Sequence, residues 1–172
     1  MLEYLKKYER GEKFLFMANR EVPDLDQALD EMQAAIIQDA RETFSEEVVN
    51  RWLHPKNIGR MENPHGVGRI TGPCGDTMEI FLEIKGDIIT NAMFMTDGCG
   101  TSIAAGSMAA DLVTGKSIKE AYKISQEVIL DALGGLPDDS IHCALLASNT
   151  LKEAIGDYLT CKKDPWKKSY RK

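Results

Sequence analysis

Residues 77–96 read TMEIFLEIKGDIITNAMFMT, and the order of their apolar and polar side chains predicts a β-hairpin. In the first half every second side chain is apolar, the period expected of a strand with one buried face: Met78, Ile80, Leu82 and Ile84. Gly86-Asp87 is a turn sequence, and the apolar run 88–96 predicts a second strand, antiparallel to the first. Because such a pair runs out and back, we expect the residues just before 77 and just after 96 at the same edge of the sheet.

The segments around this hairpin determine the fold class. Residues 67–71 predict a short third strand. Helical patterns precede and follow the strands, and Thr101 is a suitable cap for the helix that begins after them; the expected helices cover about 24–43, 45–53, 101–113, 117–133 with a break near Ser125, and 140–159. This order predicts an α+β fold, in which helices pack on one face of a small three-stranded antiparallel sheet.

The chain is expected to have three parts. Residues 1–43 form a helical N-terminal extension with one apolar stripe, made of Leu25, Leu29, Met32 and Ile36. Residues 44–161 form the main domain. Residues 162–172 form a basic C-terminal tail, interpreted as a solvated terminus, with a docking segment for an acidic partner as the alternative.

Composition excludes several classes of protein. The net charge of −6 argues against nucleic acid as the main partner, because phosphate binding needs a basic surface. No apolar run approaches the roughly 18 residues that a membrane span needs. The first ten residues lack the apolar segment of a signal peptide and are too acidic for a transit peptide, so a cytoplasmic location is expected.

Three of the four cysteines lie in short motifs typical of metal chemistry: Pro73-Cys74-Gly75-Asp76, Gly98-Cys99-Gly100 and Ile141-His142-Cys143. Thiolates select zinc, copper(I) and iron–sulfur clusters, and a nearby carboxylate or imidazole can supply an exchangeable ligand. The hairpin should bring the first two motifs to one edge of the sheet. The candidate metal ligands are therefore Cys74, Asp76, Cys99, His142 and Cys143.

Cys99 and Cys143 both precede or begin predicted helices, where unpaired N–H groups and the helix dipole are expected to lower the pKa of a thiol. Glycines beside Cys99 should let the backbone turn tightly and a bulky cofactor approach. The alternative is structural: each cysteine could be a small buried apolar residue, Asp76 could cap a turn, and His142 could donate to a carbonyl group. Cys161, among lysines, is interpreted as an incidental surface cysteine.

From about Phe44 to Leu159 the sequence resembles the IscU/NifU-type iron–sulfur cluster assembly scaffolds, the NifU N-terminal domain family. Motifs along two thirds of the chain carry this resemblance: Phe44-Ser45-Glu46-Glu47-Val48, His54-Pro55-Lys56-Asn57-Ile58-Gly59, Cys74-Gly75-Asp76, Asp97-Gly98-Cys99-Gly100, Gly115-Lys116-Ser117 and Ile141-His142-Cys143. The fold of that family agrees with the α+β fold predicted from the residues.

The resemblance implies a scaffold, not an enzyme, on which a [2Fe–2S] cluster is built transiently from Fe²⁺ and sulfur and then passed to apo-proteins. By this analogy Cys74, Cys99 and Cys143 are the cluster thiolates, and Asp76 or His142 occupies the remaining position. Cys143 would accept sulfur from a pyridoxal-dependent cysteine desulfurase. Frataxin-like or chaperone partners and a homo-oligomer are further expectations. The chaperone-docking segment of the family reads Leu136-Pro137-Asp138-Asp139-Ser140 here, with two acids in place of its apolar and basic positions, which argues against chaperone-driven transfer by that route.

Two other functions remain open at this point, because such a site also takes Zn²⁺. One is a zinc-bound sulfurtransferase, in which the metal activates a thiolate that accepts persulfide from the desulfurase. The other is a structural zinc domain, which should unfold when the metal is removed.

Overall fold

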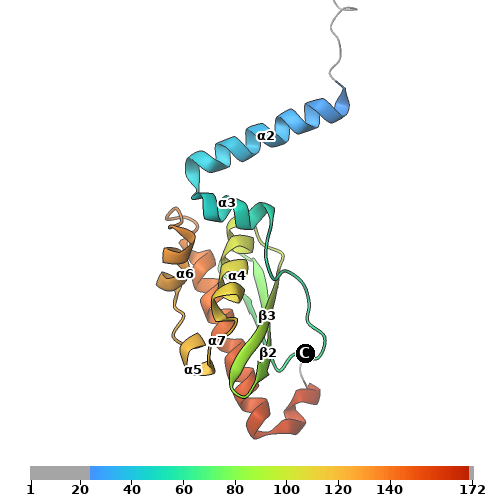
Figure 1. Cartoon of the computed structure of the whole chain (residues 1–172), viewed down its shortest axis with the longest axis vertical. Helices are drawn as coiled ribbons and strands as arrows, with labels where there is room; N and C mark the ends of the chain where they lie inside the picture. Colours follow the sequence, from blue (N-terminus) through green and yellow to red (C-terminus); the bar gives the residue numbers. More distant parts are fainter. Residues whose placement is uncertain (1–23, 171–172) are drawn as a thin grey trace, which may run out of the picture. The chain divides into compact units, whose positions relative to one another are not determined.

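The computed structural model describes residues 24–170 (Figure 1). The helices and strands follow in the order α2 (Leu25–Thr43), α3 (Glu46–Leu53), β1 (Gly66–Thr71), β2 (Thr77–Lys85), β3 (Ile88–Thr96), α4 (Gly100–Val113), α5 (Ile118–Ala121), α6 (Gln126–Leu133), α7 (Ile141–Lys163) and the 3₁₀ helix η1 (Pro165–Tyr170). Among these described helices, none is long and apolar enough to cross a bilayer.

The three strands form one antiparallel sheet in the order β1-β2-β3, as predicted. In β2 and β3 the register pairs Met78 with Thr96 and Lys85 with Ile88, so the hairpin closes at Gly86-Asp87. Both turn residues have positive φ, 58° at Gly86 and 64° at Asp87, which suits a tight turn between two strands. The residues before β2 and after β3 therefore lie at one edge of the sheet.

Helices α4 and α7 cover one face of the sheet (Figure 1). The alternating apolar residues of β2 are buried against them, and Phe94 of β3 is fully buried. Small residues allow this close packing, since a Cβ at Gly106 of α4 would lie 2.4 Å from the Phe94 ring. Likewise, a Cβ at Gly68 of β1 would lie 2.1 Å from the backbone oxygen of Thr150 in α7. The predicted α+β fold is confirmed.

Helix boundaries mostly agree with the sequence pattern, with two corrections. Helix α4 begins one residue earlier than predicted, so its N-cap is Cys99, and Thr101 lies inside its first turn. Helix α7 continues to Lys163, beyond the predicted end near residue 159, and η1 follows it, so most of the predicted basic tail is helical. The end of α7 is stabilised by Lys162 and Lys163, whose positive charges lie near the negative end of the helix dipole.

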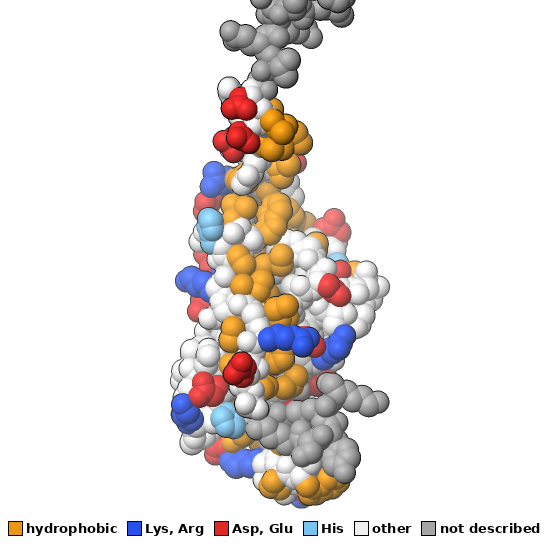
Figure 2. Space-filling model, turned by 90° about the vertical axis from the view of Figure 1, so that its right-hand side faces the viewer, with side chains coloured by type: hydrophobic (Ala, Val, Ile, Leu, Met, Phe, Trp, Pro, Cys, Tyr) orange, Lys and Arg blue, Asp and Glu red, His pale blue; other side chains and the backbone are white. Residues whose placement is uncertain are grey.

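The chain divides into two compact units, Met1–Gln38 and Asp39–Lys172. Of the predicted N-terminal extension, residues 1–23 lie outside the described residues, and helix α2 is present where the pattern predicted it. The four apolar residues of the predicted stripe on α2 are each more than half exposed: Leu25, Leu29, Met32 and Ile36. Figure 2 shows apolar side chains, in orange, at the surface of the molecule.

Candidate functional site

Three elements bring the predicted site residues toward one end of the sheet. Cys74 and Asp76 lie in the turn between β1 and β2, where the Gly72 N–H donates to the Asp76 carbonyl at 2.8 Å. Cys99 is the N-cap of α4, directly after β3. Cys143 is the third residue of α7, with His142 before it. The hairpin argument thus predicted correctly that the first two of these segments lie at one edge of the sheet.

The Thr101 hydroxyl joins the two helical cysteines. Its Oγ1 lies 3.0 Å from the Sγ of Cys99 and 3.3 Å from the Sγ of Cys143. Cys99 is exposed, whereas Cys143 is completely buried. The structure therefore places an accessible and an inaccessible thiol on either side of one hydroxyl group.

A second hydroxyl, that of Ser102, connects the carboxylate to this pair. Its Oγ donates to Oδ2 of Asp76 at 2.7 Å and lies 3.4 Å from the Sγ of Cys143. Gly98 makes room for the carboxylate, since a Cβ there would lie 2.3 Å from Asp76 Oδ2. This glycine thus has a packing role that differs from the approach of a cofactor expected from the sequence.

The other two predicted ligands lie farther out. His142 Nε2 is 3.7 Å from the Sγ of Cys143. Cys74 is exposed, next to Gly75, whose φ of 93° shapes the turn. Within residues 24–170, no three His, Cys, Asp or Glu side chains are close enough together to hold a metal ion. The structure thus brings together Cys99, Cys143 and Asp76 through hydroxyl groups, and His142 beside Cys143, but it does not bring Cys74 into contact with them.

The two thiols differ in their pKa. At Cys99, partial burial disfavours the thiolate, but hydrogen bonds from Thr101 and Ser102 outweigh it and lower the pKa. At Cys143, burial raises the pKa, hydrogen bonds from Ser102 and Thr101 offset this only in part, and the neighbouring Cys99 raises it further. The expectation of a lowered pKa was therefore right for Cys99 and wrong for Cys143, because burial of the Cys143 thiol outweighs the hydrogen bonds that it receives.

An apolar pocket of about 180 Å³ adjoins Cys99. Its walls include Phe44, Val48 and Trp52, and its polar edge is formed by Thr101 and Ser140. Gly100 allows the indole to pack on the start of α4, because a Cβ there would lie 2.8 Å from the Trp52 ring. The exposed thiol thus has an aromatic and aliphatic surface beside it.

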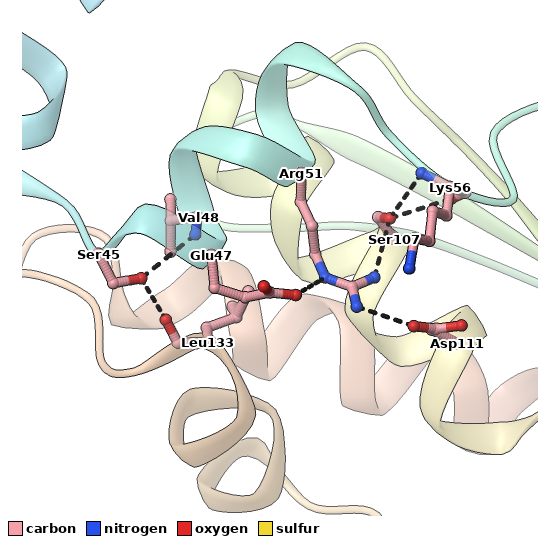
Figure 3. Close-up of polar contacts among 8 residues, drawn as sticks. All are labelled: Ser45, Glu47, Val48, Arg51, Lys56, Ser107, Asp111 and Leu133. Atoms are coloured by element: carbon pink, nitrogen blue, oxygen red, sulfur yellow. Dashed lines mark hydrogen bonds and ion pairs between the residues drawn. The ribbon is translucent and has the colours of Figure 1, made fainter. Parts of the chain in front are cut away.

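A buried arginine holds α3, and with it Trp52, against α4 (Figure 3). Arg51 donates to Glu47 at 2.6 Å, to Ser107 at 3.2 Å and to Asp111 at 2.8 Å. Ser107 in turn accepts from the Lys56 N–H at 3.0 Å, which fixes the loop after α3. These bonds connect the helix that lines the pocket to the helix that carries Cys99.

The sequence interpretation missed three of these residues. Thr101 was interpreted as a helix cap, and Ser102 and Arg51 were not singled out. A usable signal was present for the last, because Glu47 and Arg51 have the i,i+4 spacing of a helical ion pair. For Ser102, the signal was a hydroxyl within a run of small apolar residues, since a buried hydroxyl needs a partner.

Comparisons with known proteins define the family. Residues 43–164 match the family described as NifU-like N terminal domain. This match covers well over half of the chain, which therefore belongs to that family and confirms the resemblance inferred from the motifs.

Individual relatives agree with this assignment. The chain is 41% identical over 116 residues to iron–sulfur cluster assembly scaffold protein IscU 1 of Archaeoglobus fulgidus, covering 67% of this chain and 76% of the relative. It is 38% identical over 120 residues to the scaffold protein IscU of Escherichia coli, covering 67% and 93%. In structure it resembles a NifU-like N-terminal protein from Brucella abortus with a TM-score of 0.53, covering 67% and 94%. At 16% identity, this last likeness concerns the fold alone.

Proposed function

We propose that this protein is a non-catalytic scaffold on which a [2Fe–2S] cluster is assembled and from which it is passed to apo-proteins. One observation carries the proposal beyond family membership. Two thiols, Cys99 at the N-cap of α4 and Cys143 in α7, share the Thr101 hydroxyl, and the Ser102 hydroxyl links the Asp76 carboxylate to the Cys143 thiol. Soft thiolates with one hard oxygen ligand fit iron that is to be held and then released.

In this proposal the cluster is cargo, and Cys74, Cys99 and Cys143 supply its thiolates, with Asp76 or His142 in the remaining position. Cys74 is exposed in the turn between β1 and β2, and among the described residues it does not form a ready metal site with the other two cysteines, so cluster binding is proposed to draw these thiols together. An exposed ligand on a turn and a weakly bound carboxylate both favour release, whereas four fixed thiolates suit a cluster that stays.

Sulfur is proposed to arrive as the persulfide of a cysteine desulfurase. The thiolate of Cys143 attacks the outer sulfur atom, a new S–S bond forms on Cys143, and the desulfurase cysteine leaves as a thiolate. Because Cys143 is completely buried, this step requires the first turn of α7 to separate from α4. Apo-proteins are the proposed recipients. Frataxin-like or chaperone partners, homo-oligomers and a cytoplasmic location remain predictions.

Metal analysis of protein purified without oxygen, combined with its visible spectrum after addition of Fe²⁺, cysteine and a desulfurase, tests the proposal. A scaffold is expected to develop the absorption of a [2Fe–2S] cluster and to lose it when an apo-ferredoxin is added. Stable stoichiometric zinc with faster desulfurase turnover and no colour would instead indicate a zinc-bound sulfurtransferase. Unfolding upon zinc removal would indicate a structural zinc domain.

A further inference from the structure

Ser102 is a buried polar residue next to the proposed ligands, and its own role is not explained by the fold. It lies in the first turn of α4 with none of its surface exposed, and the N-cap of this helix is Cys99. Its hydroxyl makes its shortest contact, 2.7 Å, with the carboxylate of Asp76. The next contact, 3.4 Å, is with the thiol of Cys143.

The hydroxyl carries one proton, so it can donate to only one of these groups at a time. A carboxylate is a charged acceptor and forms the stronger, shorter hydrogen bond. Ser102 therefore donates to Oδ2 of Asp76, and Oδ1 takes no part in this hydrogen bond. Backbone contacts fix the other end of the same residue, since the Asp76 carbonyl accepts from Gly72.

We propose that Ser102 is a positioning residue, which orients the Asp76 carboxylate toward the Cys99 and Cys143 thiols so that it can serve as the oxygen ligand. This inference rests on the proposed function, because it needs the thiols to bind metal. Hydrogen bonds to metal-binding carboxylates commonly orient the ligand, and losing one typically weakens metal binding by about 10- to 100-fold.

A purely structural role for Ser102 makes a different prediction. If Ser102 only fills space between α4 and its neighbours, its removal should disturb metal binding whether or not Asp76 is present. If it acts through Asp76, its removal should have no effect once the carboxylate is gone. A double-mutant cycle separates the two cases.

The probe is Co²⁺ alone, titrated without oxygen into the full chain, with affinity and thiolate-to-cobalt charge-transfer absorption as readouts. Ser102→Ala is expected to weaken Co²⁺ binding about tenfold while the charge-transfer absorption per bound ion stays unchanged, because the thiolates remain. Asp76→Ala should weaken binding as well, and the double variant should bind as Asp76→Ala does. Ser148→Ala is the matched control, since Ser148 is also a fully buried serine in a helix but donates to the Leu145 carbonyl at 3.1 Å.

Ser102→Thr keeps the hydroxyl and is expected to bind within about threefold of the original chain, well inside the loss expected for the alanine variant. The inference is overturned if Ser102→Ala has no effect, if it weakens binding equally with and without Asp76, or if Ser102→Thr loses as much affinity as Ser102→Ala. Failure of the unaltered chain to bind Co²⁺ would contradict the proposed function itself.

Discussion

The hydroxyl of Thr101 lies 3.3 Å from the thiol of Cys143, although 42 residues separate them in the chain. The contact joins the first turn of α4 to the first turn of α7, and Cys99 lies on the other side of the same hydroxyl. The candidate site is therefore made by the packing of two helix N-termini against each other, and in it the Cys99 thiol is exposed and the Cys143 thiol is buried.

This arrangement predicts that the two thiols react in a fixed order. In the native protein, iodoacetamide should modify Cys99 before Cys143, and the rate should begin to rise at a lower pH than for an ordinary cysteine, because hydrogen bonds from Thr101 and Ser102 lower the pKa of Cys99. Cys143 should stay unmodified, because it is buried and its pKa is raised. Mass spectrometry of peptides after timed labelling checks both rates. Modification of native Cys143 as fast as Cys99 would show that the packing of α7 against α4 does not protect the Cys143 thiol.

Arg51 should contribute substantially to stability. Arg51→Met removes hydrogen bonds from a buried charged group to Glu47, Ser107 and Asp111, and is expected to lower the free energy of unfolding by about 2 kcal/mol. Urea unfolding measures this difference. Arg60→Met is the control, because Arg60 is 71% exposed, and its ion pair with Glu79 should contribute less than about 1 kcal/mol. Equal losses in the two variants would contradict the role of Arg51 in holding α3.

Alanine substitution should change the free energy of unfolding in opposite directions at Gly68, which packs against α7, and at Gly156, which lies within α7. Gly68→Ala places a methyl group against the Thr150 carbonyl and should destabilise the protein by about 2–3 kcal/mol. Gly156→Ala, on the exposed side of α7 with no atom within 4 Å, should stabilise it by up to about 1 kcal/mol. Thermal or urea unfolding of both variants checks the packing of β1 on this helix, which a tolerated Gly68→Ala would contradict.

Asp87 predicts a pH dependence of stability. Its carboxylate accepts from Lys162 at 2.6 Å and from Tyr158 at 3.1 Å, and these bonds lower its pKa in the folded state. Since the folded pKa is the lower one, the stabilisation is fully present above the unfolded value of about 3.9 and is lost as pH falls through the folded value.

The variant Asp87→Asn isolates this effect, because asparagine also tolerates the positive φ of 64° at this position. The chain should be more stable than the variant near pH 6, and the difference should narrow below about pH 4. Urea unfolding at several pH values measures it. A difference that stays constant down to the acid limit would show that Asp87 has no lowered pKa.

The sheet was predictable because strand pairing leaves a local pattern. The alternation in 77–84 and the Gly86-Asp87 turn determine which residues face the helices and where the chain reverses. Helix ends at Ser45 and Gly134 also follow local rules, namely capping by a side-chain oxygen and a left-handed residue at the C-terminus. The sequence did not predict Cys99 as the N-cap, because cysteine is not among the residue types that favour this position. In the structure the Cys99 side chain makes no capping hydrogen bond, so it leaves no capping signal in the sequence.

The site was predictable only in part. The hairpin predicts that the motifs of Cys74 and Cys99 lie at one edge, but no local pattern encodes that Cys143 is buried beneath α4. Ser102 and Thr101 acquire their linking roles through Asp76 and Cys143, which lie 26 to 42 positions away, so these roles depend on tertiary packing.

The central claim is that Cys74, Cys99 and Cys143 together hold a cluster, and serine substitution of each cysteine tests it most directly. Oxygen-free reconstitution with Fe²⁺, cysteine and a desulfurase is followed by visible absorption in four single variants. Cys161→Ser is the control, because Cys161 lies near the C-terminal end of α7 and Cys143 near its N-terminal end. We predict that the cluster forms in the unaltered chain and in Cys161→Ser, and is lost or strongly reduced in each of the other three. Full absorption in any one of those three variants, or its absence in the unaltered chain, would contradict the claim.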